Sequence, residues 1–453
     1  MELTLPENVK KIIKTLKNAG FDAYAVGGCV RDVLLDRKPY DWDVTTDALP
    51  EQVKSLFRRT VDTGIRHGTV TVMMNDEAHV YRGYEVTTYR IDGEYEDSRH
   101  PKNVTFTGDL REDLRRRDFT INAMAYNEET GLVDEFGGVV DLKRHIIRAV
   151  GDPYERFTED ALRILRAYRF AAQLGFGIDE DTEEAASKLK ANLKNISAER
   201  IQTELTKLIC SPHPDVILDM YRAGITGVIL PEFDVCMKLD QKSKHHLYSV
   251  GDHTVRALMV NAEFSGIEFD DDTIRFIRYA ILFHDFGKPE AMTEDETGIR
   301  HFKGHALISE RISKDIMKRL KLDNETIHTV SSLVRWHDYR PEATEANVRR
   351  AMNKLGPEIY RLLFPIRIAD TLAQSLYKRD EKLAYEKEIM KLYAGIMERG
   401  EPVTLKDLAV TGNDLIERGY RPGPELGKKL NELLELILED PKCNTKEYLL
   451  SKI

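Results

Sequence analysis

The feature that most constrains the fold is a glycine pair near the N-terminus, followed at short distance by an Asp-x-Asp triplet. Gly27 and Gly28 end an apolar run at 24–26 and precede a helix-like segment. Asp41 and Asp43 come next, and alternate residues of a strand point to one face, so the two carboxylates can converge. Paired carboxylates beside a glycine-rich turn at a helix start are typical of sites that hold metal ions on a triphosphate. The pattern indicates nucleotidyl transfer.

Composition limits the classes of protein that the chain can belong to. With 453 residues, of which 42% are hydrophobic, two to four domains with ordinary cores are expected. The net charge of -10 excludes a uniformly basic nucleic-acid binder but not a local basic groove. No apolar run approaches the roughly 20 residues of a membrane span, and residues 1–20 predict an amphipathic helix rather than a signal peptide. The cysteines are scattered without a CxxC motif, which argues against a zinc knuckle or disulfide framework and fits a cytoplasmic location: Cys29, Cys210, Cys236 and Cys443.

Periodicity divides the chain into a mixed part and a helical part. Residues 21–150 alternate short strands and helices, with strands expected at 69–74 and 81–89 and a long polar loop at 92–109. Beyond residue 150 the pattern is helical, and the first helices are expected at 157–173, 180–192, 197–210 and 214–223. We therefore predict an α+β head at 1–150 and three helical parts at 151–230, 231–375 and 376–453.

Two arginine-rich segments follow the Asp-x-Asp triplet. In RRRDFTINAMA at 115–125, Arg116 and Arg117 can form a cationic wall for phosphates, or the segment is a charged helix start capped by Asp118. In EDALRILRAYRF at 159–170, Asp160 and Arg163 are expected to share one helix face. The stripe formed by Arg163, Arg166 and Arg169 is either a solvated face or a track for phosphates.

The Asp160–Arg163 pair has two interpretations. One is an intrahelical salt bridge. The other is base recognition, because cytosine and adenine both present an amine donor beside a ring-nitrogen acceptor, whereas guanine and uracil present the reverse order. An Asp acceptor beside an Arg donor would then replace a nucleic-acid template.

Histidines are concentrated at 245–375. The stretch ILFHDFGKPEA places His284 beside Asp285, and imidazole with carboxylate suits a transition metal that activates water. The alternative is a buried histidine cluster that only shapes an RNA-binding domain.

Five motifs in register resemble the class II tRNA nucleotidyltransferase and bacterial poly(A) polymerase family: GGCVRDVLL with DWD, RRDFTINAMA, DEFGG with Arg148 downstream, EDALRILRAYRF and ISAERIQTEL. The C-terminal segment 411–450 resembles the tail of CCA-adding enzymes from Gram-positive-type bacteria. The resemblance implies a polymerase-β-like palm, an all-α neck, a body and a tail. It implies stepwise addition of C, C and A from CTP and ATP to a tRNA 3′ end without a template. No membrane partner is expected.

The same resemblance implies roles for individual residues. Asp41 and Asp43 would hold Mg²⁺, and Glu85 is either a third carboxylate of that site or a surface residue. The triphosphate would lie by Gly27, Gly28 and Arg31, the nucleotide by Arg116, Arg117, Asp118 and Asn122, and the base by Asp160 and Arg163. The helical body resembles an HD-type metal phosphohydrolase, with His253, His284, Asp285 and Asp370 as ligands of a second divalent metal and with His305 and His337 as additional histidines. His245 and His246 make the identity of the first ligand ambiguous.

Four alternatives remain at the level of the sequence. A poly(A) polymerase of this family tends to carry a basic C-terminal extension, whereas 14 Lys and Arg face 15 Asp and Glu from Tyr377 onward, which favours the tRNA role. An enzyme that adds only A would share every motif. The chain could also be chiefly an HD-type phosphohydrolase, or an RNA chaperone that consumes no CTP. No pattern gives the oligomeric state.

Overall fold

The computed structural model describes residues 3–75, 80–93, 104–242, 247–260 and 268–453. The chain divides into two compact units, Met1–Pro231 and Glu232–Ile453, each of which is described by itself. None of the helices in the described ranges is long and apolar enough to cross a membrane. The finer division into four parts stays a prediction.

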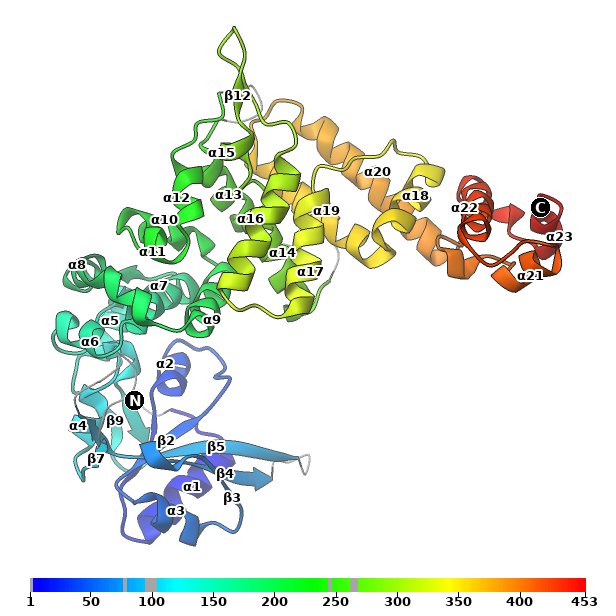
Figure 1. Ribbon diagram of the computed structural model, residues 1–453. Coiled ribbons are helices and arrows are strands. Elements are labelled where there is room, and N and C mark those ends of the chain that lie inside the picture. The colour runs from blue at the N-terminus through cyan, green and yellow to red at the C-terminus, as the bar shows by residue number, and fades with distance from the viewer. Residues whose placement is uncertain (1–2, 76–79, 94–103, 243–246, 261–267) are drawn as a thin grey trace. The chain divides into compact units, whose positions relative to one another are not determined.

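The first unit begins with a seven-stranded sheet in the order β3-β4-β5-β2-β1-β8-β9 (Figure 1). β2 and β5 run parallel and the other neighbours are antiparallel. A cluster of buried residues that includes Tyr24, Tyr89 and Leu114 forms a core beside the central strands. The elements of this α+β head are α1 (Glu7–Asn18), β1 (Ala23–Val26), α2 (Gly28–Leu34), β2 (Asp43–Thr46), α3 (Pro50–Leu56), β3 (Thr60–Gly64), β4 (Thr69–Asn75), β5 (Tyr81–Thr88), β6 (Arg90–Asp92), β7 (Val104–Phe106), α4 (Leu110–Arg115), β8 (Ala125–Asn127), β9 (Gly131–Val133), α5 (Gly138–Arg144) and β10 (Ile146–Ile147).

The polar segment 92–109 is not entirely a loop. β7 pairs antiparallel with β6, with Ile91 opposite Thr105. The prediction missed this hairpin because β7 is only three residues long and is set in polar sequence. Residues 94–103 of the predicted loop lie outside the described residues.

Helices complete the first unit: α6 (Pro153–Glu159), α7 (Leu162–Leu174), α8 (Glu180–Leu189), α9 (Ala198–Ile209), α10 (Ile217–Arg222) and α11 (Thr226–Ile229), with the short strand β11 (Gly177–Ile178) paired to β10. The prediction of one helix over 157–173 is wrong. Asp160 is extended, with φ -140° and ψ 103°, and its side chain accepts a hydrogen bond from the backbone N–H of Leu162. An aspartate that caps the following turn competes with helix continuation, and periodicity alone does not detect this.

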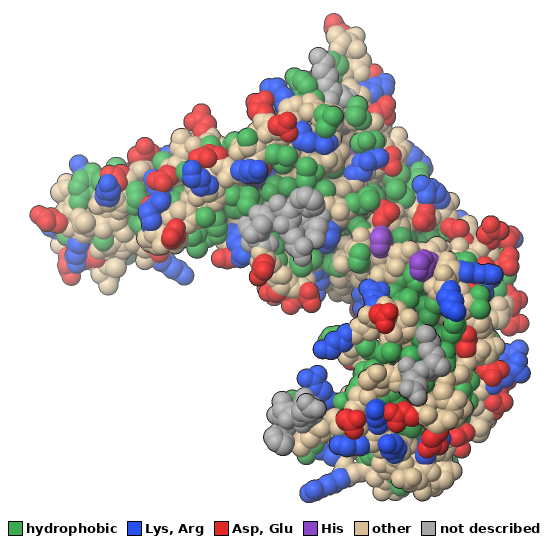
Figure 2. All heavy atoms as spheres, turned by 180° about the vertical axis from the view of Figure 1, so that it is seen from behind, with side chains coloured by type: hydrophobic (Ala, Val, Ile, Leu, Met, Phe, Trp, Pro, Cys, Tyr) green, Lys and Arg blue, Asp and Glu red, His purple; other side chains and the backbone are tan. Residues whose placement is uncertain are grey.

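The second unit is helical: α12 (Pro231–Met237), α13 (Val250–Met259), α14 (Asp271–Phe283), α15 (Lys288–Ala291), α16 (His305–Arg319), α17 (Asn324–Trp336), α18 (Glu345–Leu355), α19 (Pro357–Ala373), α20 (Arg379–Glu398), α21 (Gly412–Glu417), α22 (Pro424–Glu439) and α23 (Lys446–Leu450), with a hairpin of β12 (Thr293–Glu294) and β13 (Arg300–His301). Its C-terminal helices have a hydrophobic cluster of their own, which includes Leu415, Leu434 and Ile437. An α+β head followed by helices confirms the predicted fold class. Figure 2 shows acidic and basic side chains interspersed over the visible face of the units.

Candidate nucleotide site and histidine centre

The glycine pair forms the turn from β1 into α2. Gly27 has φ +84° and ψ -131°, a conformation open only to glycine, and its N–H donates to the carbonyl of Met124 at 3.0 Å. A Cβ at this position would lie 2.8 Å from Nη1 of Arg117. Glycine is therefore required both by the backbone and by the close approach of an arginine. Gly28 begins the helix beside Arg31.

Three carboxylates gather beside this turn. Asp43 begins β2, Asp41 lies two residues before it, and Glu85 on β5 is the register partner of Asp43. Burial raises the pKa of Asp43 to about 6, and the charges of Glu85 and Asp41 add to the rise. Clustered carboxylates that repel one another are relieved by a bound cation, and oxygen donors suit Mg²⁺. The residues present therefore fit the divalent metal that the fold implies.

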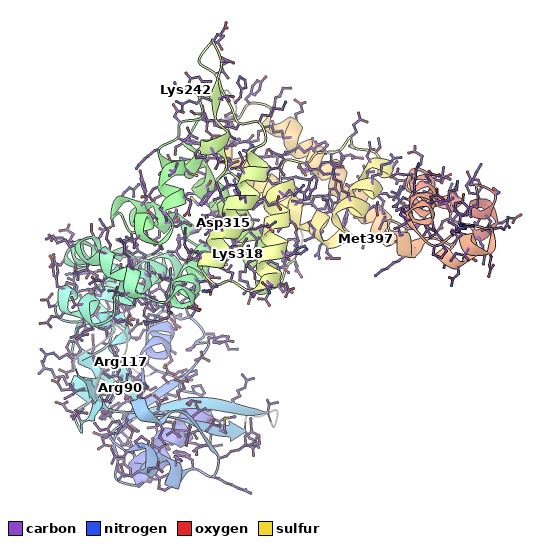
Figure 3. All side chains as sticks on the ribbon, in the orientation of Figure 1. Arg90, Arg117, Lys242, Asp315, Lys318 and Met397 are labelled. Atoms are coloured by element: carbon purple, nitrogen blue, oxygen red, sulfur yellow. The ribbon has the colours of Figure 1, made fainter. Side chains whose placement is uncertain are left out.

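Asp113 connects the carboxylate strand to the arginines. It is fully buried in α4 and accepts hydrogen bonds from Arg116, at 2.7 Å from Nη2, and from the hydroxyl of Thr45 on β2 at 3.0 Å. Oδ2 of Asp113 also lies 3.6 Å from Nη2 of Arg117, and the backbone N–H of Arg90 donates to Oδ1 at 3.4 Å. Figure 3 shows Arg90 and Arg117 near each other at the sheet. The two arginines predicted as a phosphate wall thus share one buried anchor.

A second network joins the glycine turn to α7. Nη1 of Arg31 donates to Oδ1 of Asn122 at 2.7 Å, and the amide of Asn122 donates to Asp118 at 3.1 Å. Asp118 also accepts from Nε of Arg166 at 2.7 Å. Burial would raise the pKa of Asp118, but the charge of Arg166 and the bond from Asn122 hold it well below its usual range. Asp118 is therefore a buried link between predicted site residues rather than a helix cap.

A cavity of about 260 Å³ opens beside these networks, and Asp160 and Arg163 both line it. Asp160 lies outside α7, and the two side chains do not form the intrahelical salt bridge that is one of the two interpretations of the pair. Asp160 binds Nη2 of Arg200 on α9 at 2.7 Å, while Nη1 of Arg163 donates to Glu159 at 2.6 Å. The complete lining is Arg116, Arg117, Asp118, Asp160, Leu162, Arg163, Arg166 and Arg200.

The arginine stripe of α7 is not a solvated face. Arg163 and Arg169 are buried and Arg166 is about one third exposed. Arg169 pairs with the buried carboxylate of Glu204 and with Gln173, and it does not line the cavity.

The second unit brings together the predicted histidine-centre residues from α13, the end of α14 and α19. Nε2 of His253 lies 3.0 Å from Oδ1 of Asp370 and 3.6 Å from Oδ2 of Asp285. Nε2 of His284 lies 3.3 Å from the same Oδ2. All four side chains are buried. His305 and His337 also reach this centre, whereas His245 and His246 lie outside the described residues.

The charges of the histidine centre are strongly coupled. Burial would raise the pKa of Asp285, but the neighbouring His284 and Lys288 hold it well below its usual range. Burial would lower the pKa of His284, but Asp285 raises it to about 9. Burial lowers the pKa of His337 to about 4. The centre thus combines carboxylates that stay ionised with imidazoles in unlike states.

The sequence analysis missed three residues that hold the nucleotide site together: Asp113, Glu159 and Arg200. Asp113 precedes the arginine run, Glu159 is adjacent to Asp160, and Arg200 lies inside ISAERIQTEL. Each carries a charge within or beside a motif, which was the available signal. The pairing itself could not be predicted, because Asp160 and Arg200, for example, are 40 residues apart in the sequence.

A mixed sheet with clustered carboxylates at a glycine turn, followed by a helical cavity with paired charges, defines a nucleotidyltransferase. The chain matches the Poly A polymerase head domain over residues 23–148, the "Probable RNA and SrmB- binding site of polymerase A" over 175–237 and the tRNA nucleotidyltransferase domain 2 over 292–453. It is 38% identical to the CCA-adding enzyme of Lactobacillus helveticus, covering 94% of this chain and 91% of that protein. It is 35% identical to the CCA-adding enzyme of Enterococcus faecalis, covering 99% and 96%.

A solved structure agrees. The CCA-adding enzyme of Bacillus stearothermophilus in complex with CTP superposes with a TM-score of 0.71 at 30% identity, over 98% of this chain and 96% of that one. The chain therefore belongs to the family of CCA-adding enzymes, which are tRNA nucleotidyltransferases. This confirms the resemblance, the polymerase-β-like head and the enzyme class predicted from the sequence.

Proposed function

We propose that this protein adds C, C and A in turn to the 3′ end of tRNA, using CTP and ATP. The observation that carries the proposal is the placement, within one compact unit, of a carboxylate cluster, a glycine turn and a cavity with an acceptor–donor pair. The family supports this activity, because the relatives named above are CCA-adding enzymes.

The reaction joins the tRNA 3′-hydroxyl to the α-phosphorus of the nucleotide. The bond between the α-phosphorus and the oxygen of the leaving pyrophosphate breaks, and the hydroxyl proton is released to the solvent. Mg²⁺ at Asp41 and Asp43 would supply charge stabilisation for the attacking and leaving oxygens. Arg116 and Arg117, anchored by Asp113, would bind the phosphates. Gly27 lets Arg117 approach the turn closely, so a bound triphosphate would meet both.

Base selection is assigned to Asp160 and Arg163. A carboxylate accepts from the exocyclic amine of cytosine or adenine, and a guanidinium donates to the adjacent ring nitrogen. The ion pairs with Arg200 and Glu159 would hold the two side chains in register. Guanine and uracil would leave buried polar groups unpaired, which is a costly mismatch.

The test uses Mg²⁺ and a tRNA transcript that lacks its 3′ CCA, with CTP alone, ATP alone and both. We expect the tRNA to be extended by two nucleotides with CTP alone and by a third when ATP is also present. The Asp41→Ala variant should not extend it. A long A ladder would indicate a poly(A) polymerase, and A addition only to tRNA ending in CC would indicate an A-adding enzyme. Unchanged incorporation by Asp41→Ala would contradict the metal assignment. A cytoplasmic location stays a prediction.

We propose a second site in the other unit, where His253, His284, Asp285 and Asp370 hold a divalent transition metal. Nδ1 of His284 lies 2.7 Å from the carbonyl of Ile281, so Nδ1 carries a proton and Nε2 is the nitrogen that binds a metal when the ring is neutral. That Nε2 is buried and makes no hydrogen bond with any described residue. Ligand atoms of one metal, held at about 2.0–2.2 Å, lie roughly 3–3.6 Å from one another, which fits the separations given above.

This site gives the HD-type phosphohydrolase alternative its support. The direct test is elemental analysis of the full-length protein after loading with Zn²⁺ and desalting. We expect His284→Ala to lose bound metal relative to the parent protein. Equal metal content in both would contradict the assignment.

A further inference from the structure

The side chain of Arg200 lies beside the residues assigned to base selection, and its donors are not all used by the protein. Nη2 of Arg200 donates to Oδ2 of Asp160 at 2.7 Å, and Arg200 lines the nucleotide cavity together with Asp160 and Arg163. Nη1 of Arg200 is buried and makes no hydrogen bond with any described residue. A buried donor without an acceptor costs free energy, which a ligand recovers when it supplies the acceptor. Arg200 can therefore contact the nucleotide as well as Asp160.

Arg163 is fixed by acceptors other than Asp160. Its Nη1 donates to the carboxylate of Glu159 at 2.6 Å, and its Nη2 donates to the carbonyl of Arg116 at 2.9 Å. Arg163 belongs to α7, whereas Arg200 reaches the cavity from α9. The two guanidinium groups thus approach the cavity from different helices. With the carboxylate of Asp160, they offer a base one donor, one acceptor and a second donor.

Packing of α9 against α7 holds Arg200 in place. The N–H of Arg200 donates to the carbonyl of Ser197 at 3.1 Å, in the first turn of α9. Glu204, one turn further along the helix, forms an ion pair with Arg169 of α7, and both of these side chains are buried. A guanidinium positioned in this way loses little conformational entropy when it binds a base.

The two accepted bases differ on one side of the exocyclic amine. Adenine presents its N6 amine between two ring acceptors, N1 and N7, whereas cytosine presents its N4 amine between the acceptor N3 and a C5–H group. With Arg163 at N1 or N3 and Asp160 at the amine, a donor beyond Asp160 meets N7 of adenine but only C5–H of cytosine. Guanine also carries N7, but its O6 would face the carboxylate of Asp160 and its N1–H the guanidinium of Arg163.

We infer that Arg200 is a specificity-determining residue that donates to N7 of adenine and so gives ATP a hydrogen bond that CTP lacks. The inference rests on the proposed function, because it takes Asp160 and Arg163 as the readers of the amine and ring nitrogen common to both bases. It gives the buried Nη1 or the remaining N–H of Nη2 an acceptor. It also predicts that addition of A depends on Arg200 more strongly than addition of C does.

Atom substitution in the nucleotide tests the inference. The full-length protein, with Mg²⁺ and a tRNA ending in CC, is supplied with ATP, with 7-deaza-ATP, in which C–H replaces N7, or with 1-deaza-ATP, in which C–H replaces N1. The kcat/KM of the parent protein should be lower for 7-deaza-ATP than for ATP by roughly tenfold to a hundredfold, the range for a hydrogen bond to a charged group. The readout is the ratio of the two kcat/KM values, in which a general loss of activity cancels.

Two variants of Arg200 assign the effect to its side chain. Arg200→Lys keeps a cation beside Asp160 but lacks the planar fork that can bind a carboxylate and a base at once, so the ratio should fall towards unity. Arg200→Ala should lower the ratio in the same way and slow the use of ATP more than that of CTP. Lys207→Ala, at an exposed cation of the same helix, is the matched control and should keep the parent ratio. Thermal melting of each variant checks that the first unit remains folded.

The outcomes separate this inference from the proposed function. Equal use of ATP and 7-deaza-ATP by the parent protein would overturn the N7 contact, while poor use of 1-deaza-ATP would still support the reading of N1 by Arg163. A parent-like ratio in both Arg200 variants would show that Arg200 only anchors Asp160 and would likewise overturn the inference. No addition of A from ATP to the tRNA ending in CC would contradict the proposed function and the inference with it.

Discussion

At the scale of single residues, the nucleotide site depends on charged side chains that line the cavity and also form an ion pair with a neighbour. Asp160 and Arg163 line the cavity while each is held by another ion pair, with Arg200 and Glu159. A charged side chain already fixed by a partner loses little conformational entropy when it meets a base. The fixed geometry, rather than the charges alone, would then distinguish cytosine and adenine from the other bases.

Replacing Arg163 tests this role. Arg163→Ala should slow CMP incorporation by roughly tenfold to a hundredfold and relax selection among the four triphosphates, because the donor to the ring nitrogen is lost. Single-nucleotide incorporation assays with each triphosphate measure the effect. Arg222→Ala, at an exposed arginine of α10, is the control. A uniform rate loss with unchanged selectivity would show that Arg163 only supports the fold.

Asp118 gives the first unit a dependence on pH. Arg166 and Asn122 hold its pKa below the usual range, although burial alone would raise it. The unfolded chain binds this proton near pH 3.9. The contribution of the Asp118 carboxylate to the free energy of unfolding is therefore fully present above about pH 5. It is lost as the pH falls through the folded-state pKa of Asp118.

Urea unfolding measures this contribution, followed by Trp42 fluorescence in a Trp336→Phe background that removes the only other tryptophan. Asp118→Asn should lower the free energy of unfolding at pH 7 by about 1.5–3 kcal/mol, since the buried carboxylate loses its charge-assisted hydrogen bond to the partly exposed Arg166. The difference from the parent protein should shrink towards pH 3.5. A constant difference would contradict the linkage, and Asp62→Asn, at an exposed position of β3, is the control.

At the scale of elements, short connections position the site. The turn from β1 into α2 requires Gly27, and the break between α6 and α7 places Asp160 at a helix end. The sequence predicts the first, because a glycine pair between an apolar run and a helix pattern is typical of a tight strand-to-helix turn. It does not predict the second, because the residues at 157–173 keep helical periodicity through the break. Register is also inaccessible to periodicity, so Glu85 beside Asp43 is established only by the pairing of β2 with β5.

Substitutions at Gly27 and Gly20 distinguish the effect of backbone strain from that of steric contact with Arg117. Gly27→Ala should cost about 1–3 kcal/mol of stability from its positive φ and should also displace Arg117, so incorporation should fall at least tenfold. Gly20→Ala is a matched control, because Gly20 also has a positive φ, of 88°, but its Cβ would meet nothing within 4 Å in the described structure. The control should lose stability and keep activity. Equal activity of the two variants would contradict the role of the Arg117 contact.

At the scale of the whole molecule, the chain has two compact units with different candidate ligands. The histidine centre shows why such a site is only partly predictable. His284 and Asp285 are adjacent in the sequence, but the approach of His305 to His337 depends on the packing of α16 against α17.

Ligands should therefore stabilise the two units selectively. By calorimetry, CTP with Mg²⁺ should raise the melting temperature of one transition, and Zn²⁺ should raise that of another. A ligand at a hundred times its dissociation constant adds about 2.7 kcal/mol. Asp41→Asn/Asp43→Asn should abolish the effect of CTP with Mg²⁺ and leave that of Zn²⁺. One transition that responds to both ligands would contradict independent units.

The ion pair between Asp160 and Arg200 has a consequence for the gene. The identity of the nucleotides added to a tRNA would depend on two codons that lie 40 positions apart. One encodes Asp160, which recognises the base, and the other encodes Arg200, which holds Asp160 in place. A substitution at codon 200 cannot be compensated at codon 160, because the carboxylate there has to meet the base. An error in the anchor would therefore become an error in the bases added to the tRNA.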